Sequence, residues 1–310
     1  MNFDFGGTLR RAWEITWKHK ILWLFGILSA IAGRASYSRG PSFPNNNNFN
    51  PNNPDFFQRF QANNPNLTQS TIIGIAVGIL CVVLIIVLTL YVLHVIGRGG
   101  LIGGIQLGDT SGQVSFGQAW GAGVSHFWTV LIIGLIVALI ALVIGIASVF
   151  LVATICLTPL ACVGFLLIAV LGVFTLLAQI AAVTENLSIS EALGRALAVV
   201  QANLASVLLL GVLLIIIEAV AGFIIAVPFF IALAPLFLAM GAALAAQSST
   251  PFGVGAIVSG LCFVVWIPFA LVLRGILETW VVSAWTLAYK QLGTNRGPAV
   301  APAAPAPMAS

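Results

Sequence analysis

Residues 71–96, TIIGIAVGILCVVLIIVLTLYVLHVI, decide the fold class. The stretch holds 26 residues, and none of them is Asp, Glu, Lys or Arg. As a helix it would be about 39 Å long at about 1.5 Å per residue, and the hydrocarbon core of a bilayer is roughly 30 Å thick. Apolar runs longer than about 18 residues are typical of transmembrane helices. The stretch therefore predicts a membrane span.

The whole chain shares the apolar character of this span. Of its 310 residues, 60% are hydrophobic and only 6% are charged, and the mean hydropathy is +1.10. A soluble domain carries about 25% charged residues, and a soluble protein this apolar would expose large aggregating patches. The net charge of +4 comes from scattered bases rather than from a cluster, which argues against a nucleic-acid partner. We expect an all-α, polytopic transmembrane helix bundle in a lipid bilayer.

Further apolar runs predict about six spans, within a range of six to eight. The expected spans are residues 21–33, 71–96, 127–154, 160–183, 204–227 and 254–292. The first is short and needs the interfacial turn before it to reach across the bilayer. Residues 228–247 contain Pro228 and Pro235 and form either a full span or a broken, re-entrant one. Bases near the start of the chain predict a cytoplasmic N-terminus.

The chain divides into four segments by composition. Residues 1–33 hold an interfacial helix and the first span, and residues 34–70 form an Asn/Pro-rich flexible loop. Residues 71–292 form the membrane helix bundle, and residues 293–310 form a disordered Ala/Pro-rich tail. The loop contains too little apolar surface to offset the entropy of ordering it.

Three amphipathic stretches look alike, and each leads into a span. They are residues 7–20, 115–126 and 188–203. The matching positions are Ala12, Trp13 and His19 in the first stretch, Ala119, Trp120 and His126 in the second, and Ala192, Leu193 and Val199 in the third. The pattern predicts one unit, an interfacial helix followed by a membrane hairpin, repeated three times. Repeated membrane units are common in transporters.

Three ionisable residues inside apolar segments form the candidate intramembrane polar site: Glu218, Arg274 and Glu278. Glu218 lies deep in a predicted span, where an ionisable group is costly and needs a partner. Arg274 and Glu278 are four residues apart and so share one helix face. A buried network of Glu218 with Arg274 would serve proton or substrate movement. Alternatively, Glu218 is protonated and hydrogen-bonded, or it joins two helices.

The sequence predicts no catalytic, cofactor-binding or metal site. The three histidines occur singly, and the four cysteines lie in apolar runs without zinc-type spacing. Hydrolase and phosphate-loop motifs are missing. The glycine-rich residues 97–109 lack the dinucleotide fingerprint, because Ile102 stands where a glycine is needed. We expect these glycines, like Gly74 and Gly78, to allow close helix packing.

Two motifs carry a resemblance to a known family. They are ENLSISEALGRA at residues 185–196 and WTLAYKQL at residues 285–292. Both look like the uncharacterised bacterial polytopic membrane proteins related to the membrane domain of glycerophosphoryl diester phosphodiesterases. The resemblance implies a six-span architecture in a bacterial cytoplasmic membrane. It does not imply the phosphodiesterase activity, because in those enzymes that chemistry belongs to a separate soluble domain.

Three classes of function remain open from the sequence. The favoured one is a non-catalytic scaffold or accessory protein that assists a membrane protein partner or lipids in the bacterial cytoplasmic membrane. The alternative is a transporter or lipid-handling protein that uses a midplane site around Glu218. A membrane enzyme ranks last, because it would need a polar cluster that the sequence does not contain. The oligomeric state stays open.

Overall fold

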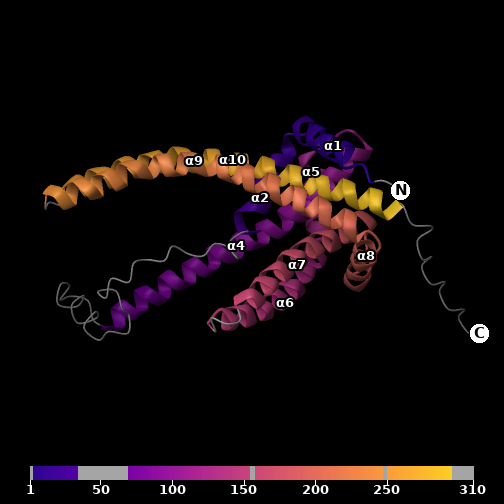
Figure 1. The fold of residues 1–310 in the computed structure, drawn as a ribbon, viewed down its shortest axis with the longest axis horizontal. Helices are drawn as coiled ribbons and strands as arrows, with labels where there is room; N and C mark the ends of the chain where they lie inside the picture. Colours follow the sequence, from indigo (N-terminus) through magenta and orange to yellow (C-terminus); the bar gives the residue numbers. More distant parts are fainter. Residues whose placement is uncertain (1–2, 34–68, 154–157, 247–249, 295–310) are drawn as a thin grey trace, which may run out of the picture. The chain divides into compact units, whose positions relative to one another are not determined.

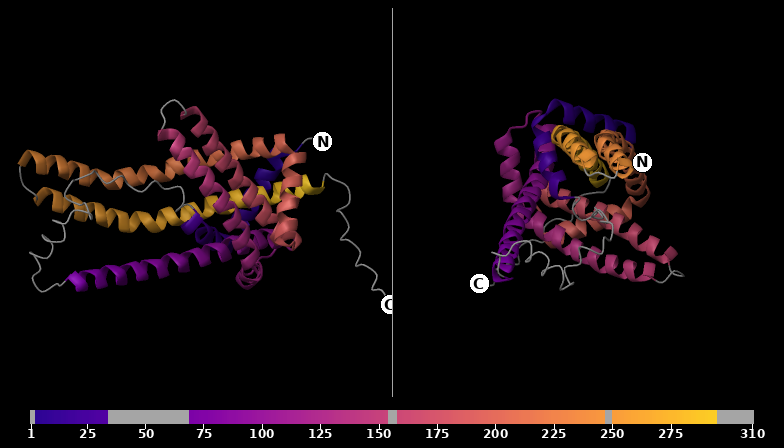
Figure 2. Two further views of the ribbon diagram at one scale, coloured as in Figure 1. Left: turned by 90° about the horizontal axis from the view of Figure 1, so that it is seen from below. Right: turned by 90° about the vertical axis from the view of Figure 1, so that its left-hand side faces the viewer.

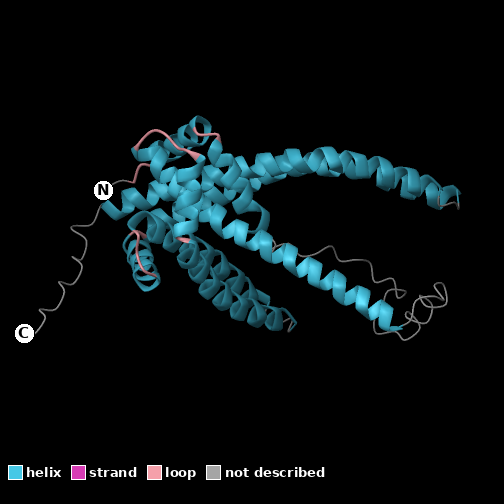
Figure 3. Cartoon of the chain, turned by 180° about the vertical axis from the view of Figure 1, so that it is seen from behind, coloured by secondary structure: helices cyan, strands magenta, loops and turns pink. Residues whose placement is uncertain are grey.

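The computed structural model describes residues 3–33, 69–153, 158–246 and 250–294 (Figure 1). In these ranges every regular element is an α-helix (Figure 3), which confirms the predicted all-α class. The Asn/Pro-rich loop expected at residues 34–70 and the tail expected at residues 293–310 fall almost entirely outside the described residues.

The described helices fall into short and long ones. They are α1 (Phe5–Lys18), α2 (Ile21–Gly33), α4 (Gln69–Thr110), α5 (Phe116–Ser125), α6 (Phe127–Ala153), α7 (Thr158–Glu185), α8 (Ile189–Ala202), α9 (Leu204–Ala246) and α10 (Thr250–Thr294). Five of them, α4, α6, α7, α9 and α10, are long and apolar enough to cross a membrane, and α2 is a shorter apolar helix. The chain is therefore a multi-pass membrane protein.

The chain forms two compact units, residues 31–94 and the remainder. In the smaller unit, the first part of α4 exposes its apolar side chains on all sides, from Ile75 to Leu90. Gly74 and Gly78 lie on this part, and a methyl group built at either one would meet no described atom within 4 Å. The close helix contact expected at these two glycines stays a prediction.

Three helices are longer than the predicted spans. α9 runs unbroken through Pro228 and Pro235, so residues 204–227 and 228–247 are not separate elements. α4 likewise continues past Ile96 to Thr110. Each proline removes one backbone hydrogen bond and leaves the rest of the helix intact, which membrane helices tolerate. With 42 to 45 residues, α4, α9 and α10 are each about 63–68 Å long at about 1.5 Å per residue.

The order of the described helices agrees with the predicted threefold repeat. Among these helices, each unit is a short amphipathic helix followed by two more: α1 precedes α2 and α4, α5 precedes α6 and α7, and α8 precedes α9 and α10. The amphipathic helices begin at the polar residues Asp4, Ser115 and Ser188. Such side chains satisfy the free N–H groups of a first helical turn. Local sequence therefore fixes where each repeat starts.

Each amphipathic helix buries a pair of small residues four positions apart. The pairs are Ala12 and Thr16 in α1, Ala119 and Gly123 in α5, and Ala192 and Ala196 in α8. Residues four apart lie on one face of a helix, so each pair marks the side that packs inward. The buried small residues allow α1, α5 and α8 to approach their neighbours closely.

The amphipathic helices join the repeats to one another. α5 packs on the end of α4, because Gly123 and Ala119 lie against Gly99 and Gly100. α8 packs on α7, and α1 packs on α10 (Figure 2). Each amphipathic helix thus packs on the last helix of another repeat, and the contact of α1 with α10 joins the first repeat to the last.

The glycines of α4 confirm the close packing expected for residues 97–109. A methyl group at Gly103 would lie 2.5 Å from Ala122 Cβ, and one at Gly104 would lie 2.6 Å from a Leu22 methyl group. One at Gly97 would lie 2.6 Å from Leu28 Cβ. Real side chains do not approach this closely, so only glycine lets α2 and α5 sit against α4.

The core of the larger unit lies where the C-terminal ends of α4, α7 and α10 meet. Ile102 and Ile105 from α4, Ile180 from α7 and Ala284 and Ala288 from α10 are all fully buried there. The three ends therefore form one packed junction, and charged residues near these ends are brought together.

Candidate functional site

Two acidic residues lie at helix C-termini in this junction. Asp109 is in the last turn of α4, and Glu185 is the last residue of α7. α7 ends there because the next residue, Asn186, has a φ of 51°, the left-handed conformation that commonly terminates helices. A helix C-terminus carries partial negative charge, so a carboxylate is unfavourable there without a cation or donor nearby. Both acids therefore need partners.

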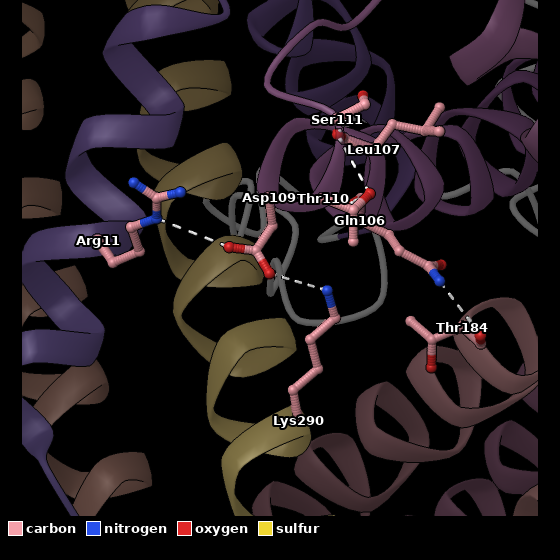
Figure 4. A network of polar contacts seen from close by, with 8 residues as sticks. All are labelled: Arg11, Gln106, Leu107, Asp109, Thr110, Ser111, Thr184 and Lys290. Carbon is pink, nitrogen blue, oxygen red and sulfur yellow. Dashed lines mark hydrogen bonds and ion pairs between the residues drawn. The ribbon is translucent and has the colours of Figure 1, made fainter.

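Asp109 binds a different cation with each carboxylate oxygen (Figure 4). Lys290 Nζ from α10 donates to Oδ2 at 2.9 Å, and Arg11 Nε from α1 lies 3.6 Å from Oδ1. The side chains of Asp109 and Lys290 are 24% and 29% exposed, whereas that of Arg11 is 51% exposed. Exposed ion pairs contribute little, so the bond to Lys290 is the stronger link. Together the three residues join α1, α4 and α10.

Glu185 joins α7 to α8 and α10 in the same way. The hydroxyl of Tyr289 donates to Glu185 Oε1 at 2.6 Å, and Arg195 Nε lies 3.3 Å from Oε2. Tyr289 is buried, so its hydroxyl depends on this bond. Tyr289 and Lys290 are consecutive residues of α10. One turn of α10 therefore holds both acidic helix ends.

Neutral hydrogen bonds complete the junction. Gln106 Nε2 of α4 donates to the Thr184 carbonyl oxygen of α7 at 3.3 Å (Figure 4). Thr8 Oγ1 of α1 donates to Gln291 Oε1 of α10 at 3.2 Å. These bonds link α4 to α7 and α1 to α10. Direct polar contacts therefore connect all three of the long helix ends in pairs.

The contacts of the junction cross-link helices. Both carboxylates accept a hydrogen bond from a side chain of α10. Among the described residues, no three His, Cys, Asp or Glu side chains lie close enough together to hold a metal ion. The arrangement holds helices together at one end of the bundle.

The sequence-predicted residues Glu218, Arg274 and Glu278 lie elsewhere, along α9 and α10, and all three are half-buried. Arg274 Nη1 lies 3.9 Å from the position that a Cβ on Gly222 would take, one helical turn from Glu218. Arg274 therefore faces α9 near Glu218. Glu278 has a different neighbour, because Ser29 Oγ of α2 donates to it at 3.5 Å. The predicted network of Glu218 with Arg274 stays a prediction.

Sequence reasoning missed the junction residues Asp109, Glu185, Tyr289 and Lys290 as a site. A usable signal was present, since two acidic residues end two apolar helices, where the helix dipole disfavours them. Charged residues at span ends are ordinary, however, and the sequence does not reveal which cation meets which acid.

No protein-family model, curated protein or solved structure matches the chain. Two features of the structure bear on the function of the chain. They are the cross-linked junction of the helix ends and the ionisable residues of α9 and α10.

Proposed function

We propose that the chain is a non-catalytic scaffold or accessory protein of the bacterial cytoplasmic membrane. One observation carries the proposal: the acidic residues Asp109 and Glu185 are used to join the three repeats to one another. A junction of this kind joins long helices at their C-terminal ends. Apolar side chains such as Leu261 and Val265 stay exposed along these helices, where lipid or the helices of a partner cover them.

We propose that the junction lies at the cytoplasmic face. The amphipathic helix α1 carries Arg10, Arg11 and Lys18, and the junction adds Arg195 and Lys290. Basic residues accumulate on the cytoplasmic side of membrane proteins. The two motifs that resemble the membrane domain of glycerophosphoryl diester phosphodiesterases also fall on the junction, at residues 185–196 and 285–292. We therefore propose that relationship as well, with the cross-linked helix ends as its structural signature.

The scaffold proposal is tested by site-specific crosslinking in the native membrane. A photoreactive leucine analogue replaces Leu261, which is exposed on α10, and in a matched control it replaces Leu177, which is buried in α7. We expect the analogue at position 261 to crosslink one membrane protein in a fixed ratio, and the control to crosslink only within the chain. The partner should also become less abundant in cells that lack this chain. Crosslinks to lipid alone from position 261, with unchanged partner levels, would reject the scaffold proposal.

A transporter or lipid-handling protein is the second candidate. It is favoured by Glu218 and Arg274, ionisable residues within apolar helices, with Arg274 packed near Gly222 on the helix that carries Glu218. Ionisable groups in such positions mark ion and substrate pathways. Proteoliposomes loaded with a pH-sensitive dye test it, with Glu218→Gln as the variant and Glu14→Gln, at an exposed position, as the control. Proton-coupled flux that is lost only in Glu218→Gln would favour transport over the scaffold.

A further inference from the structure

Four tryptophan rings form a continuous row along α1, α2 and α10. Trp280 contacts Trp13 at a centroid distance of 5.6 Å, Trp13 contacts Trp17 at 5.4 Å, and Trp17 contacts Trp23 at 5.2 Å. The row is anchored at both ends, because Trp23 Nε1 donates to the Thr16 carbonyl at 2.8 Å and Trp280 Nε1 donates to the Leu9 carbonyl at 3.4 Å. The protein therefore holds these rings in place.

The two middle rings remain accessible. Trp13 is 48% exposed and Trp17 is 44% exposed. The opposite face of α1 packs inward through Ala12, Ile15 and Thr16, so the orientation of the helix is fixed. An indole ring has an apolar body and a polar N–H group, and it is at home at the level of lipid headgroups.

Two basic residues flank the exposed rings. Lys18 is the last residue of α1, and Lys20 lies in the turn before α2. Both are exposed, and neither forms an ion pair with a described residue. The other bases of α1 are occupied: Arg10 and Arg11 pair with Glu14 at 3.4 and 3.5 Å, and Arg11 also pairs with Asp109. Among the bases of α1 and of the turn that follows it, only Lys18 and Lys20 form no ion pair with a described residue. They lie at the elbow between α1 and α2.

We propose that this elbow, formed by Trp13, Trp17, Lys18, Lys20 and Trp23, binds the headgroup of an anionic phospholipid. The two ammonium groups pair with the phosphate, and the indole rings lie against the glycerol and the upper acyl chains. A zwitterionic headgroup brings its own cation and gains less from two lysines. The elbow thus selects lipids by net charge, and this selection does not depend on whether the chain is a scaffold or a transporter.

The proposal is tested with the full chain in detergent by native mass spectrometry. Phosphatidylglycerol and phosphatidylcholine with identical acyl chains are titrated against the wild type, Lys18→Gln/Lys20→Gln and Lys18→Arg/Lys20→Arg. We expect the wild type to prefer phosphatidylglycerol, the glutamine variant to lose about tenfold in affinity for it, and the arginine variant to keep that affinity. Equal binding of the two lipids by the wild type would overturn the proposal.

Two further arms separate a site from general charge attraction. Arg10→Gln removes a charge from the same helix and is compared with Lys20→Gln, which removes the same charge from the elbow; only Lys20→Gln should weaken binding. An equal loss in both variants would mean attraction by net charge and would overturn the site. Inorganic phosphate at millimolar concentration should not displace the lipid, because it lacks the apolar part that contacts the rings. Displacement would mean a simple anion site and would also overturn the proposal.

Discussion

Lys290 Nζ lies 2.9 Å from Asp109 Oδ2 and connects the C-terminal parts of α10 and α4, although 181 positions separate the two residues. Both side chains are mostly buried, so the bond is screened from solvent more than a surface pair is. We expect Asp109→Asn to lower the free energy of unfolding by about 2 kcal/mol, because the oxygen that accepts from Lys290 loses its negative charge and the charge-assisted hydrogen bond becomes a weaker one.

The measurement for this pair is a double-mutant cycle with Asp109→Asn and Lys290→Gln, followed by thermal unfolding in detergent. We expect the two losses to be less than additive, because each variant removes the same bond. Strictly additive losses would show that Asp109 and Lys290 stabilise the junction independently of each other.

Tyr289→Phe should destabilise the protein by roughly 1–3 kcal/mol, because Glu185 loses a donor at 2.6 Å inside the packed junction. The control is Tyr91→Phe, which removes a hydroxyl from an exposed tyrosine on α4. Unfolding in detergent checks both variants. If the two variants unfold at the same temperature, the hydroxyl of Tyr289 does not hold α7 to α10.

Much of the fold follows from the sequence, because long runs without charge leave a helix in a bilayer as the only structure that satisfies the backbone. The helix ends that the sequence predicted next to Gly97 and Pro228 are wrong. Both residues break helices in water, yet both lie inside continuous helices here. Packing of α2 and α5 on the glycines, and tolerance of a single missing hydrogen bond, outweigh the local preference.

The candidate site was harder to predict than the fold. Glu218 stands out in a sequence because it interrupts an apolar run, whereas Asp109 and Lys290 lie at the ends of such runs, where charge is common. Their importance comes from pairing across the repeats, and pairing over 181 positions depends on how the helix ends meet. The amphipathic repeat was predictable because its signal is local.

Gly100→Ala should be strongly destabilising, because the added methyl group would lie 2.8 Å from both the Ala119 carbonyl oxygen and a Phe25 ring carbon. Overpacking of this kind costs about 1–3 kcal/mol. Gly78→Ala on the same helix is the matched control, since nothing lies within 4 Å of its added methyl group and alanine favours the helix. Thermal unfolding should fall for the first variant only; a neutral Gly100→Ala would show that α5 does not need this close approach.

His19 should make stability dependent on pH in the acidic range. It lies between α1 and α2, and its Nε2 atom is buried with no hydrogen-bond partner in the described structure. Burial and, to a lesser extent, the neighbouring Lys18 charge lower the pKa of His19 from its ordinary value of 6.5. The folded state therefore binds a proton at His19 less readily than the unfolded state does. Above pH 6.5 His19 is neutral in both states, and its contribution to the free energy of unfolding does not change with pH. Below pH 6.5 the free energy of unfolding falls, because the unfolded state binds the proton first.

The measurement is the unfolding temperature of the wild type and His19→Gln between pH 8 and pH 5. Between pH 6.5 and pH 5 the wild type should lose stability more steeply than the variant, which has no proton to bind at this position. His126→Gln serves as the control, because His126 is hydrogen-bonded to Asn186 at 3.1 Å and its loss should leave the His19 contribution in place. A wild type that gains stability towards pH 5 relative to His19→Gln would mean that the folded protein prefers the charged imidazole, contrary to its buried position against Gly108.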